Sequence, residues 1–316
     1  MKWNKQGLIF VPDTQSEWNN KGYASVPTVY VVNKDVLRIY YTGRDKENRT
    51  NISFIEVEAS NPHKILYVHD KPVLQHGTIG MFDDCGVMVS SIISVENQIW
   101  MYYIGWNVRN TIAYHNSIGL AISKDGGISF EKFSEGPLFD RTYKEPYFSA
   151  APYILRENGI WKMWYLSNTK WVEYNGKSEP FYHIKYAESD NGIDWKREGR
   201  VAIDYKDGNE CGIVRACVLK DGERYKMWYA HRNLQNYRDD KTNSYRIGYA
   251  ESSDGLAWAR MDEKVGIDVS ESGWDSEMIE YPFVYDYNEK RYMIYNGNTF
   301  GKSGFGYAIL EEESDG

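Results

Sequence analysis

A short aromatic segment recurs five times along the chain, and this repeat constrains the fold more than any other feature. The segments read LRIYYTG, IWMYYIG, WKMWYLS, YKMWYAH and RYMIYNG, and their last aromatic residues are Tyr41, Tyr103, Tyr165, Tyr229 and Tyr295. Successive tyrosines in this series are 62, 62, 64 and 66 residues apart. A regular recurrence at this period indicates a fold built from similar consecutive units.

Further strands flank each aromatic segment. An apolar strand precedes it, in VPTVYVV, VMVSSII, AAPYIL, VRACVL and EYPFVY, and the two strands form a hairpin. A third strand follows in IGLAISKDGGISF, IKYAESDNGIDW and IGYAESSDGLAW, where Asp or Asn with Gly predicts a turn. Phe130, Trp195 or Trp258 then begins a fourth, outer strand. Four strands per repeat predict an all-β fold, a five-bladed β-propeller.

The last repeat differs from the others because the chain ends soon after its third strand, GFGYAIL. The N-terminal segment GLIFV lies before the first repeat and can supply the missing strand. Such a pairing removes exposed strand edges. We therefore predict one five-bladed propeller domain over residues 1–316, with an N-terminal strand that closes the last blade.

Composition limits the partners and the compartment. The net charge of -8 and the pI near 5.4 provide no basic surface for nucleic acid. No apolar stretch is long enough to span a membrane, and no export signal is visible. Three cysteines without metal-type spacing favour a reducing compartment, so we expect a cytoplasmic protein. We expect no metal and no cofactor.

The candidate site lies at the rim where first strands begin and second strands end. Acidic residues are concentrated in the segments that enter first strands: Asp83, Asp84, Glu145, Glu210, Asp275, Glu277 and Glu280. The segments that leave second strands carry polar and aromatic residues at matching positions: Arg44, Trp106, Asn168, Arg232 and Asn298, with His231 beside Arg232. Carboxylates opposite such groups suit a sugar, which needs hydrogen bonds and an aromatic platform.

Two of these acids fit a structural role better than a functional one. Asp83 and Asp275 follow an aromatic residue in a recurring pair, which is typical of an element that joins blades. Asp83 remains a substrate-binding candidate. Asp84, Glu210 and Glu280 stand outside this pair, and we therefore take them as the catalytic candidates.

Arg215 interrupts the apolar strand VRACVL, where an unpaired charge is costly to bury. Two alternatives are open for it, an internal ion pair with Glu210 or Glu280, and a contact with the substrate. Trp171 lies in the longest loop that leaves a second strand, which indicates either a sugar platform or an interface.

The hairpins and the IGYAESSDGLAW-type motifs resemble the five-bladed propeller glycosidases, the superfamily of glycoside hydrolase families 43, 32, 68 and 130. The resemblance implies acids from successive blades, acting as base or nucleophile, as pKa modulator and as general acid. Those families often carry the general acid two residues before a proline of the third blade. Residues 149–152 read SAAP without an acid, whereas Glu280-Tyr281-Pro282 stands in the fifth blade and Glu210-Cys211 in the fourth.

The leading hypothesis is a carbohydrate-active enzyme, a glycoside hydrolase or a related transglycosylase or phosphorylase, that takes a sugar or glycan in a central funnel. A protonated carboxylic acid would donate to the departing oxygen while a second carboxylate activates water or attacks the sugar. We predict Asp84 as the base and Glu210 or Glu280 as the acid, tuned by Arg215.

The alternative hypothesis is a non-catalytic glycan-binding propeller, or an accessory propeller of a surface-polysaccharide pathway. Such a protein would work with a partner enzyme of glycan metabolism, or be fused to one. A protein-binding propeller is a third and weaker hypothesis.

Overall fold

The computed structural model describes residues 1–311, and in that part of the chain all regular structure is β-strand apart from three 3₁₀ turns. These turns are η1 (Glu17–Asn19), η2 (Asp262–Lys264) and η3 (Thr299–Gly301). The all-β prediction is confirmed. The strands form five antiparallel groups in chain order, which we call meanders 1 to 5.

The meanders have the following bounds. Meander 1 contains β2 (Ser25–Val31), β3 (Val36–Arg44), β4 (Thr50–Glu58) and β5 (Asn61–Val68). Meander 2 contains β6 (Gly86–Val95), β7 (Gln98–Val108), β8 (Tyr114–Ser123) and β9 (Glu131–Lys132). Meander 3 contains β10 (Ser149–Glu157), β11 (Ile160–Tyr174), β12 (Lys177–Ser189), β13 (Trp195–Lys196) and β14 (Val201–Ile203). Meander 4 contains β15 (Glu210–Asp221), β16 (Arg224–Asn233), β17 (Arg246–Ser252) and β18 (Ala259–Arg260). Meander 5 contains β19 (Glu280–Tyr287), β20 (Lys290–Asn296), β21 (Phe305–Leu310) and the N-terminal β1 (Trp3–Phe10).

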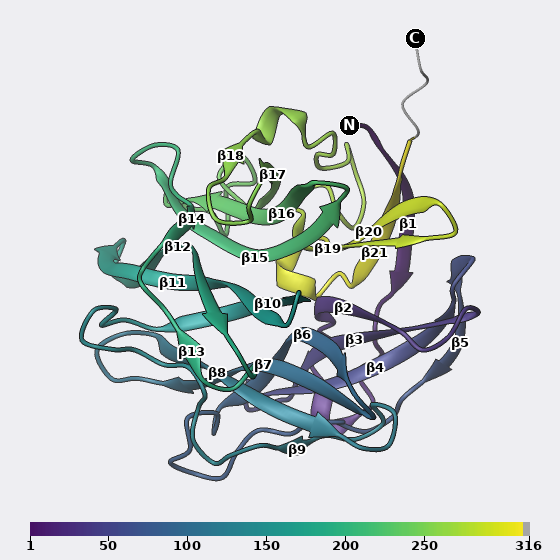
Figure 1. The fold of residues 1–316 in the computed structure, drawn as a ribbon, viewed down its shortest axis with the longest axis horizontal. Helices are drawn as coiled ribbons and strands as arrows, with labels where there is room; N and C mark the ends of the chain where they lie inside the picture. Colours follow the sequence, from purple (N-terminus) through teal and green to yellow (C-terminus); the bar gives the residue numbers. More distant parts are fainter. Residues whose placement is uncertain (312–316) are drawn as a thin grey trace.

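The first strands of the meanders lie together in the middle of the molecule. They contact one another in the order β2, β6, β10, β15, β19 and back to β2. The labels of β2, β6, β10 and β19 gather near the centre of the view (Figure 1). Single parallel pairs link neighbouring meanders at two points, Thr50 with Gly86 and Tyr182 with Gly212. The first strands of the five meanders therefore surround one central region.

The N-terminal strand pairs with the last strand of the chain. Trp3 lies opposite Leu310 and Phe10 opposite Phe305 in an antiparallel pair of β1 and β21. In Figure 1 the purple N-terminal strand lies beside the yellow C-terminal strands. The segment predicted to complete the last repeat is thus the fourth strand of meander 5.

Turns after the third strands of meanders 2, 3 and 4 bind each of these meanders to the one before it. The side chains of Asp125, Asn191 and Asp254 accept backbone N–H groups within their own turns, as the sequence predicts. The turn that follows β12 presents the carbonyl of Gly192 to the Tyr102 hydroxyl of β7 at 2.7 Å. A Cβ atom at Gly192, where φ is +76°, would stand 2.7 Å from that hydroxyl oxygen. Glycine is therefore required there by both backbone conformation and space.

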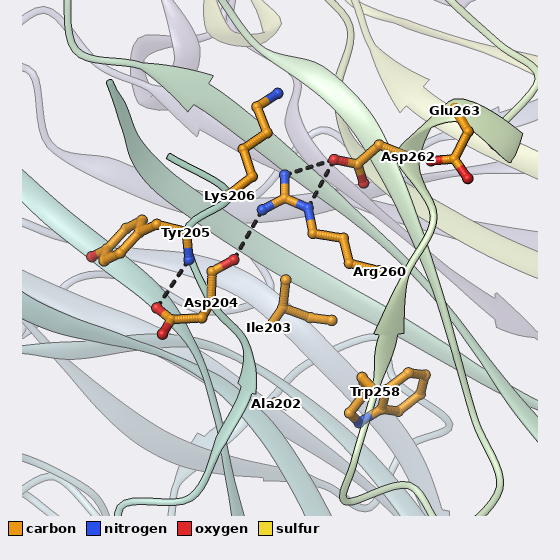
Figure 2. A pocket seen from close by; sticks show the side chains of 9 residues that line it. All are labelled: Ala202, Ile203, Asp204, Tyr205, Lys206, Trp258, Arg260, Asp262 and Glu263. Carbon is orange, nitrogen blue, oxygen red and sulfur yellow. Dashed lines mark hydrogen bonds and ion pairs between the residues drawn. The ribbon is translucent and has the colours of Figure 1, made fainter. Parts of the chain in front are cut away.

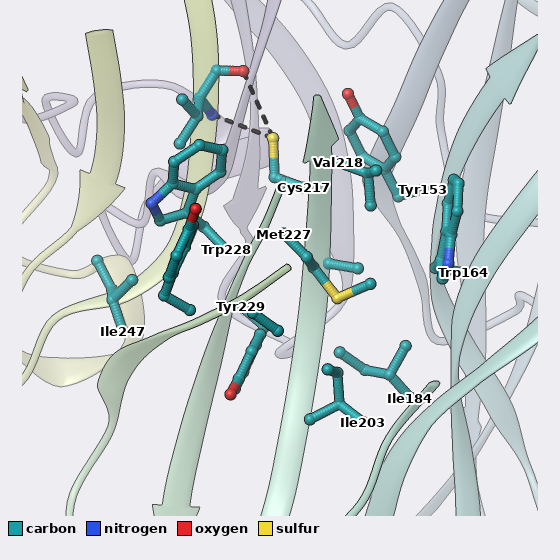
Figure 3. Close-up of a cluster of buried hydrophobic side chains, with 14 of the residues drawn as sticks. Tyr153, Trp164, Ile184, Ile203, Cys217, Val218, Met227, Trp228, Tyr229 and Ile247 are labelled. Atoms are coloured by element: carbon teal, nitrogen blue, oxygen red, sulfur yellow. Dashed lines mark hydrogen bonds between the residues drawn. The ribbon is translucent and has the colours of Figure 1, made fainter. Parts of the chain in front are cut away.

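The aromatic repeats form the cores between meanders. All five repeat tyrosines are buried, and Tyr103, Tyr165, Tyr229 and Tyr295 are 0% exposed. Trp164 of β11 and Trp228 of β16 belong to a cluster shared by meanders 3, 4 and 5 (Figure 3). In the same cluster, Cys217 of β15 accepts a hydrogen bond from the Val284 N–H of β19 at 3.1 Å. The aromatic residues of the repeats are therefore packing residues.

The three cysteines are free thiols, and Cys211 and Cys217 are buried. Within residues 1–311 we find no helix with the length and apolar character needed to cross a bilayer.

Candidate functional site

A cavity of about 440 Å³ opens where the first strands meet, and all five meanders contribute to its wall. Its charged lining consists of arginines only: Arg44, Arg215, Arg232 and Arg238. Its aromatic lining consists of Tyr23, Trp106, Tyr114, Phe148, Tyr182, Tyr237, Tyr245, Tyr281 and Phe300. No Asp or Glu of the described residues belongs to this lining. The cavity combines positive charge with broad aromatic surfaces.

Bulges in the first strands place four residues in the cavity wall. Val26, Ala151, Arg215 and Tyr281 have φ values of 56°, 46°, 62° and 54°, and all four line the cavity. Each lies where the register of its strand shifts. Positive φ in a residue with a Cβ stores about 1–3 kcal/mol of strain, and such strain is concentrated at functional sites. The recurrence of this conformation at one level of the fold marks the cavity as the candidate site.

Four of the residues predicted to bind substrate lie in this cavity: Arg44, Trp106, Arg215 and Arg232. The Trp106 indole is fixed by a hydrogen bond from Nε1 to Thr50 Oγ1 of 2.7 Å. The Arg44 guanidinium lies 5.8 Å from the Trp106 ring and 5.5 Å from the Tyr23 ring. These three side chains form an aromatic and cationic edge on the side of meanders 1 and 2.

The other predicted binding residues do not line the cavity. Trp171 stands behind it and packs on Tyr114 and Phe148, which do line it. Asn298 accepts the Glu277 N–H at 2.8 Å and so organises a turn. Asn168 is buried on β11, where its backbone N–H donates to the Phe148 carbonyl at 2.9 Å. Asp83 and His231 belong to networks outside the cavity.

A buried acid ties the outer strand of each of three meanders to its second strand. Asp83 accepts from the Tyr103 hydroxyl at 3.1 Å and pairs with Lys132 at 2.6 Å. Glu145 likewise binds Tyr165 and Arg197, and Asp275 binds Tyr295 and Lys5. In each of them the tyrosine is the last aromatic residue of the repeat. The structural interpretation of Asp83 and Asp275 therefore has a defined physical basis.

Glu210 occupies a similar position in meander 4. Arg260 binds both of its oxygens at 2.6 Å, and His231 Nδ1 lies 3.1 Å from Oε1. Burial alone would raise the pKa of Glu210, but the hydrogen bonds from Arg260 and His231 outweigh burial and lower that pKa to about 2. A carboxylate held ionised in this way is a poor proton donor. Glu210 has the bonding of a structural acid.

Arg260 belongs to a second cavity, of about 640 Å³, between meanders 3 and 4 (Figure 2). Figure 2 shows its guanidinium between Asp262 and the backbone of Asp204. Arg260 Nη2 lies 2.7 Å from Asp262, which also accepts from the Tyr229 hydroxyl. Because the central charges of this cavity are paired with one another, the arrangement stabilises the fold without a ligand.

Asp84 lies in the loop that leads to β6. Its Oδ2 accepts the Gly80 N–H at 2.9 Å, while its buried Oδ1 has no hydrogen-bond partner among residues 1–311. The next residue, Cys85, donates its backbone N–H to the Trp106 carbonyl at 3.1 Å. Asp84 thus directly precedes a residue that is hydrogen-bonded to Trp106, although Asp84 itself is not part of the cavity lining.

Glu280 begins β19, directly before the cavity residue Tyr281, and is 0% exposed. Neither of its carboxylate oxygens has a hydrogen-bond partner among the described residues. Burial raises the pKa of Glu280 well above its usual value, and the neighbouring Tyr281 side chain and the charge of Arg232 offset this only in part. A carboxyl group with a raised pKa suits the proton donation that a general acid performs.

Several residues that line the central cavity are not predicted by the sequence patterns. Tyr281 carries a signal, because it precedes a proline as Val26 and Ala151 do at their bulges. Arg238 and Phe300 come from irregular segments between strands, where no periodic pattern predicts which side chain turns inward. Within residues 1–311 no three His, Cys, Asp or Glu side chains gather as a metal site would require.

No protein-family model matches the sequence. Two uncharacterized proteins of Mycobacterium tuberculosis, MT1551 and Rv1502, are each 38% identical to it over 311 residues, which are 98% of this chain and 100% of each relative. The chain belongs to their family. The family's fold, as this member shows it, also occurs in solved structures of much lower sequence identity.

These structures are glycoside hydrolases. A glycosyl hydrolase from Bacteroides ovatus has a TM-score of 0.71 at 14% identity, with 99% of this chain and 94% of that protein covered. A thermostable family-43 glycoside hydrolase has a TM-score of 0.67 at 19% identity, with 92% and 90% covered. The GH32 β-fructofuranosidase BmSUC1 of Bombyx mori has a TM-score of 0.59 at 12% identity, with 91% and 61% covered. The chain thus shares the fold of these glycoside hydrolases.

Proposed function

We propose that this protein is a carbohydrate-active enzyme that binds a glycan in the central cavity and cleaves a glycosidic bond there. The observation that carries the proposal is the cavity itself, which lies at the meeting point of the first strands in a fold shared with glycoside hydrolases. Its aromatic side chains offer platforms for sugar rings, and its Arg and Asn groups offer hydrogen bonds to hydroxyls.

The five meanders are, in this proposal, the five blades of one propeller domain. Two observations support it, the circular order of contacts among the first strands and the pairing of β1 with β21. A closed arrangement of this kind leaves few strand edges exposed and holds the cavity walls in fixed positions.

Glu280 is the proposed general acid, and Asp84 is the proposed base. Glu280 donates its proton to the departing glycosidic oxygen, a role that its raised pKa suits. Asp84 accepts the proton of the attacking water, and its unpartnered Oδ1 is the atom that would take it. Glu210 is not given a chemical role, because its ion pair with Arg260 keeps it ionised.

The proposal is tested with aryl glycosides of graded leaving-group ability, in the wild type and the Glu280→Gln variant. We expect Glu280→Gln to lower kcat by about 100-fold or more on substrates with poor leaving groups, because proton donation contributes that much. The loss should shrink on dinitrophenyl glycosides, whose leaving group needs no proton. Arg224→Gln, at an exposed surface pair, serves as the matched control. Equal rates for wild type and Glu280→Gln on both substrate kinds would remove Glu280 from the chemistry.

A second candidate function is glycan binding without catalysis. It is favoured by the absence of any carboxylate from the cavity lining within the described part of the chain. Glycoside hydrolases use two carboxyl groups about 5 to 9.5 Å apart on either side of the bond. Glycan binding by the wild type, with no turnover of any glycoside, would establish this second function instead.

A further inference from the structure

Three of the four arginines in the central cavity have no acidic partner. Arg238 pairs with Glu179, but no Asp or Glu of residues 1–311 forms an ion pair with Arg44, Arg215 or Arg232. The one other arginine that is buried among residues 1–311, Arg38, is paired with Glu56. The central cavity therefore holds a local excess of positive charge in a protein whose net charge is -8.

Arg215 is the most deeply placed of the three. It is 1% exposed, and its guanidinium donates to the Ser90 carbonyl and, at 2.8 Å, to Thr28 Oγ1. Its Nε–H has no partner among the described residues, although Arg215 lines the cavity. Burial lowers the pKa of Arg215 to about 10, so the side chain is still charged at neutral pH. The ion pair with Glu210 or Glu280 that the sequence left open is not formed.

Arg232 is held in the same uncompensated state by aromatic residues. It is 2% exposed, and its Nε lies 3.2 Å from the hydroxyl oxygens of both Tyr182 and Tyr245. Its guanidinium carbon lies 3.7 Å from the centre of the Tyr237 ring. These neutral contacts fix the direction of the side chain and leave its charge unneutralised.

Burying an unpaired charge is costly, by several kcal/mol for each ion even after relaxation. Packing needs do not explain the arrangement, since an apolar side chain would fill the same space without that cost. A neutral sugar would not remove the charge either. An anionic group bound in the cavity would do so, because charge-assisted hydrogen bonds from arginine to carboxylate or phosphate are the strong ones.

We propose that the ligand of the central cavity is an acidic sugar, a glycan unit bearing a carboxylate or a phosphate or sulfate ester. Its acid group faces Arg215 and Arg232 and its ring lies toward Trp106, while the charge of Arg44 at the cavity edge adds to the attraction for the anion. This inference rests on the proposed function, because it names the substrate class of the same cavity.

The test begins with a glycan array that carries neutral, carboxylated, sulfated and phosphorylated sugars, probed with the full chain. We expect the bound sugars to be acidic. The best ligand is then compared by calorimetry with its own neutral form, obtained by methyl esterification or by removal of the ester. The acidic form should bind at least 10-fold more tightly, and its affinity should fall as salt rises from 50 to 500 mM. The array arms distinguish carboxylate from ester, and inorganic phosphate alone should bind more weakly than the sugar.

Variants separate a role in binding from a role in folding. Arg44→Gln, at the half-exposed edge of the cavity, should weaken the acidic ligand about 10-fold and leave its neutral form unaffected. Arg224→Gln, at an exposed pair with Glu251, should change neither. Arg215→Lys, which keeps the charge but loses the planar fork, should bind more weakly than wild type and more tightly than Arg215→Met.

The results separate the proposal of an acidic sugar from the proposal that the protein binds glycans. Equal binding of the neutral and acidic forms, or an unchanged affinity of Arg44→Gln for the acidic form, would overturn the acidic-sugar proposal. Either result would leave the proposal of glycan binding intact. Binding of inorganic phosphate as tight as that of the sugar would also overturn it. An array without any bound glycan would instead contradict the proposed function.

Discussion

Two buried glutamates, Glu210 and Glu280, have opposite surroundings. Glu210 lies in the outer network between meanders 3 and 4, where Arg260 and His231 bind its carboxylate. Glu280 lies next to the central cavity without a hydrogen-bond partner among residues 1–311. Burial is nearly complete for both, but the pKa of Glu210 is lowered and that of Glu280 is raised.

The arginines of the two regions differ in the same way. Arg260 has two carboxylates in contact, whereas Arg215 has none within the described part of the chain. The outer network is electrostatically complete in the free protein, and the central cavity is not. Charges that are all paired within the protein indicate a structural role, while an unpaired buried charge indicates a place for a ligand.

The largest expected effect comes from breaking the outer network. Glu210→Gln leaves Arg260 without its main partner, and we expect the free energy of unfolding to fall by about 3 kcal/mol or more, as for other buried pairs that lose one member. Urea unfolding at pH 7 measures this. Wild-type stability should also decline as pH falls from about 4.5 toward 2, because the folded pKa of Glu210 is depressed to about 2. Unchanged stability in the variant would contradict a structural role.

The pH dependence of the second glutamate should have the opposite sign. Glu280 has a raised folded pKa, so its contribution to stability is present below its unfolded pKa and is lost as pH rises toward the folded value. Glu280→Gln has no carboxyl group to titrate and so does not suffer this loss. Above pH ~4.5, and below the folded pKa of Glu280, we expect the free energy of unfolding of the variant to exceed that of the wild type by about 1.4 kcal/mol more for each pH unit. Urea midpoints from pH 4 to 7 measure the difference. Parallel curves for the two proteins would mean that Glu280 titrates normally.

A cavity arginine should affect binding and leave stability nearly unchanged. Arg44→Gln removes one charge from the cavity edge, and we expect acidic ligand affinity to fall about 10-fold, or about 1.4 kcal/mol. Its unfolding free energy should stay within about 0.5 kcal/mol of wild type, since Arg44 has no ion pair to lose. Calorimetry and urea unfolding on the same preparation measure both. A large loss of stability would place Arg44 with the structural residues.

The smallest effect is expected at a solvent-exposed pair. Lys196 and Asp190 lie 2.7 Å apart, but their side chains are 75% and 80% exposed. Asp190→Asn should leave the unfolding temperature unchanged, because water screens such pairs. Thermal unfolding provides the measurement, and a shift as large as that of Glu210→Gln would show that exposure does not separate the two kinds of pair.

Strand positions and part of the site follow from the sequence. The aromatic repeat gives the second strands directly, and Arg44, Trp106 and Arg232 lie in the cavity because each stands where such a strand ends. Arg215 is predicted from its charge within an apolar strand. The sequence does not show that Glu210 shares the tie formed by Asp83, since the partner, Arg260, comes from a distant outer strand.

The sequence also does not predict which side chains from irregular segments line the cavity. Arg238, Tyr245 and Phe300 reach the cavity from loops or strand beginnings whose directions depend on tertiary packing. No local pattern carries that information. The catalytic assignments of Asp84 and Glu280 stay predictions, because neither side chain is in the cavity lining.

A crystal structure of the full chain with its best glycan-array ligand is the most direct test of an acidic-sugar site in the central cavity. We expect electron density for the sugar in the central cavity, with its acid group within about 3.2 Å of a guanidinium nitrogen of Arg215 or Arg232. Density in the outer cavity beside Arg260, or a neutral edge of the sugar turned toward Arg215 and Arg232, would contradict it.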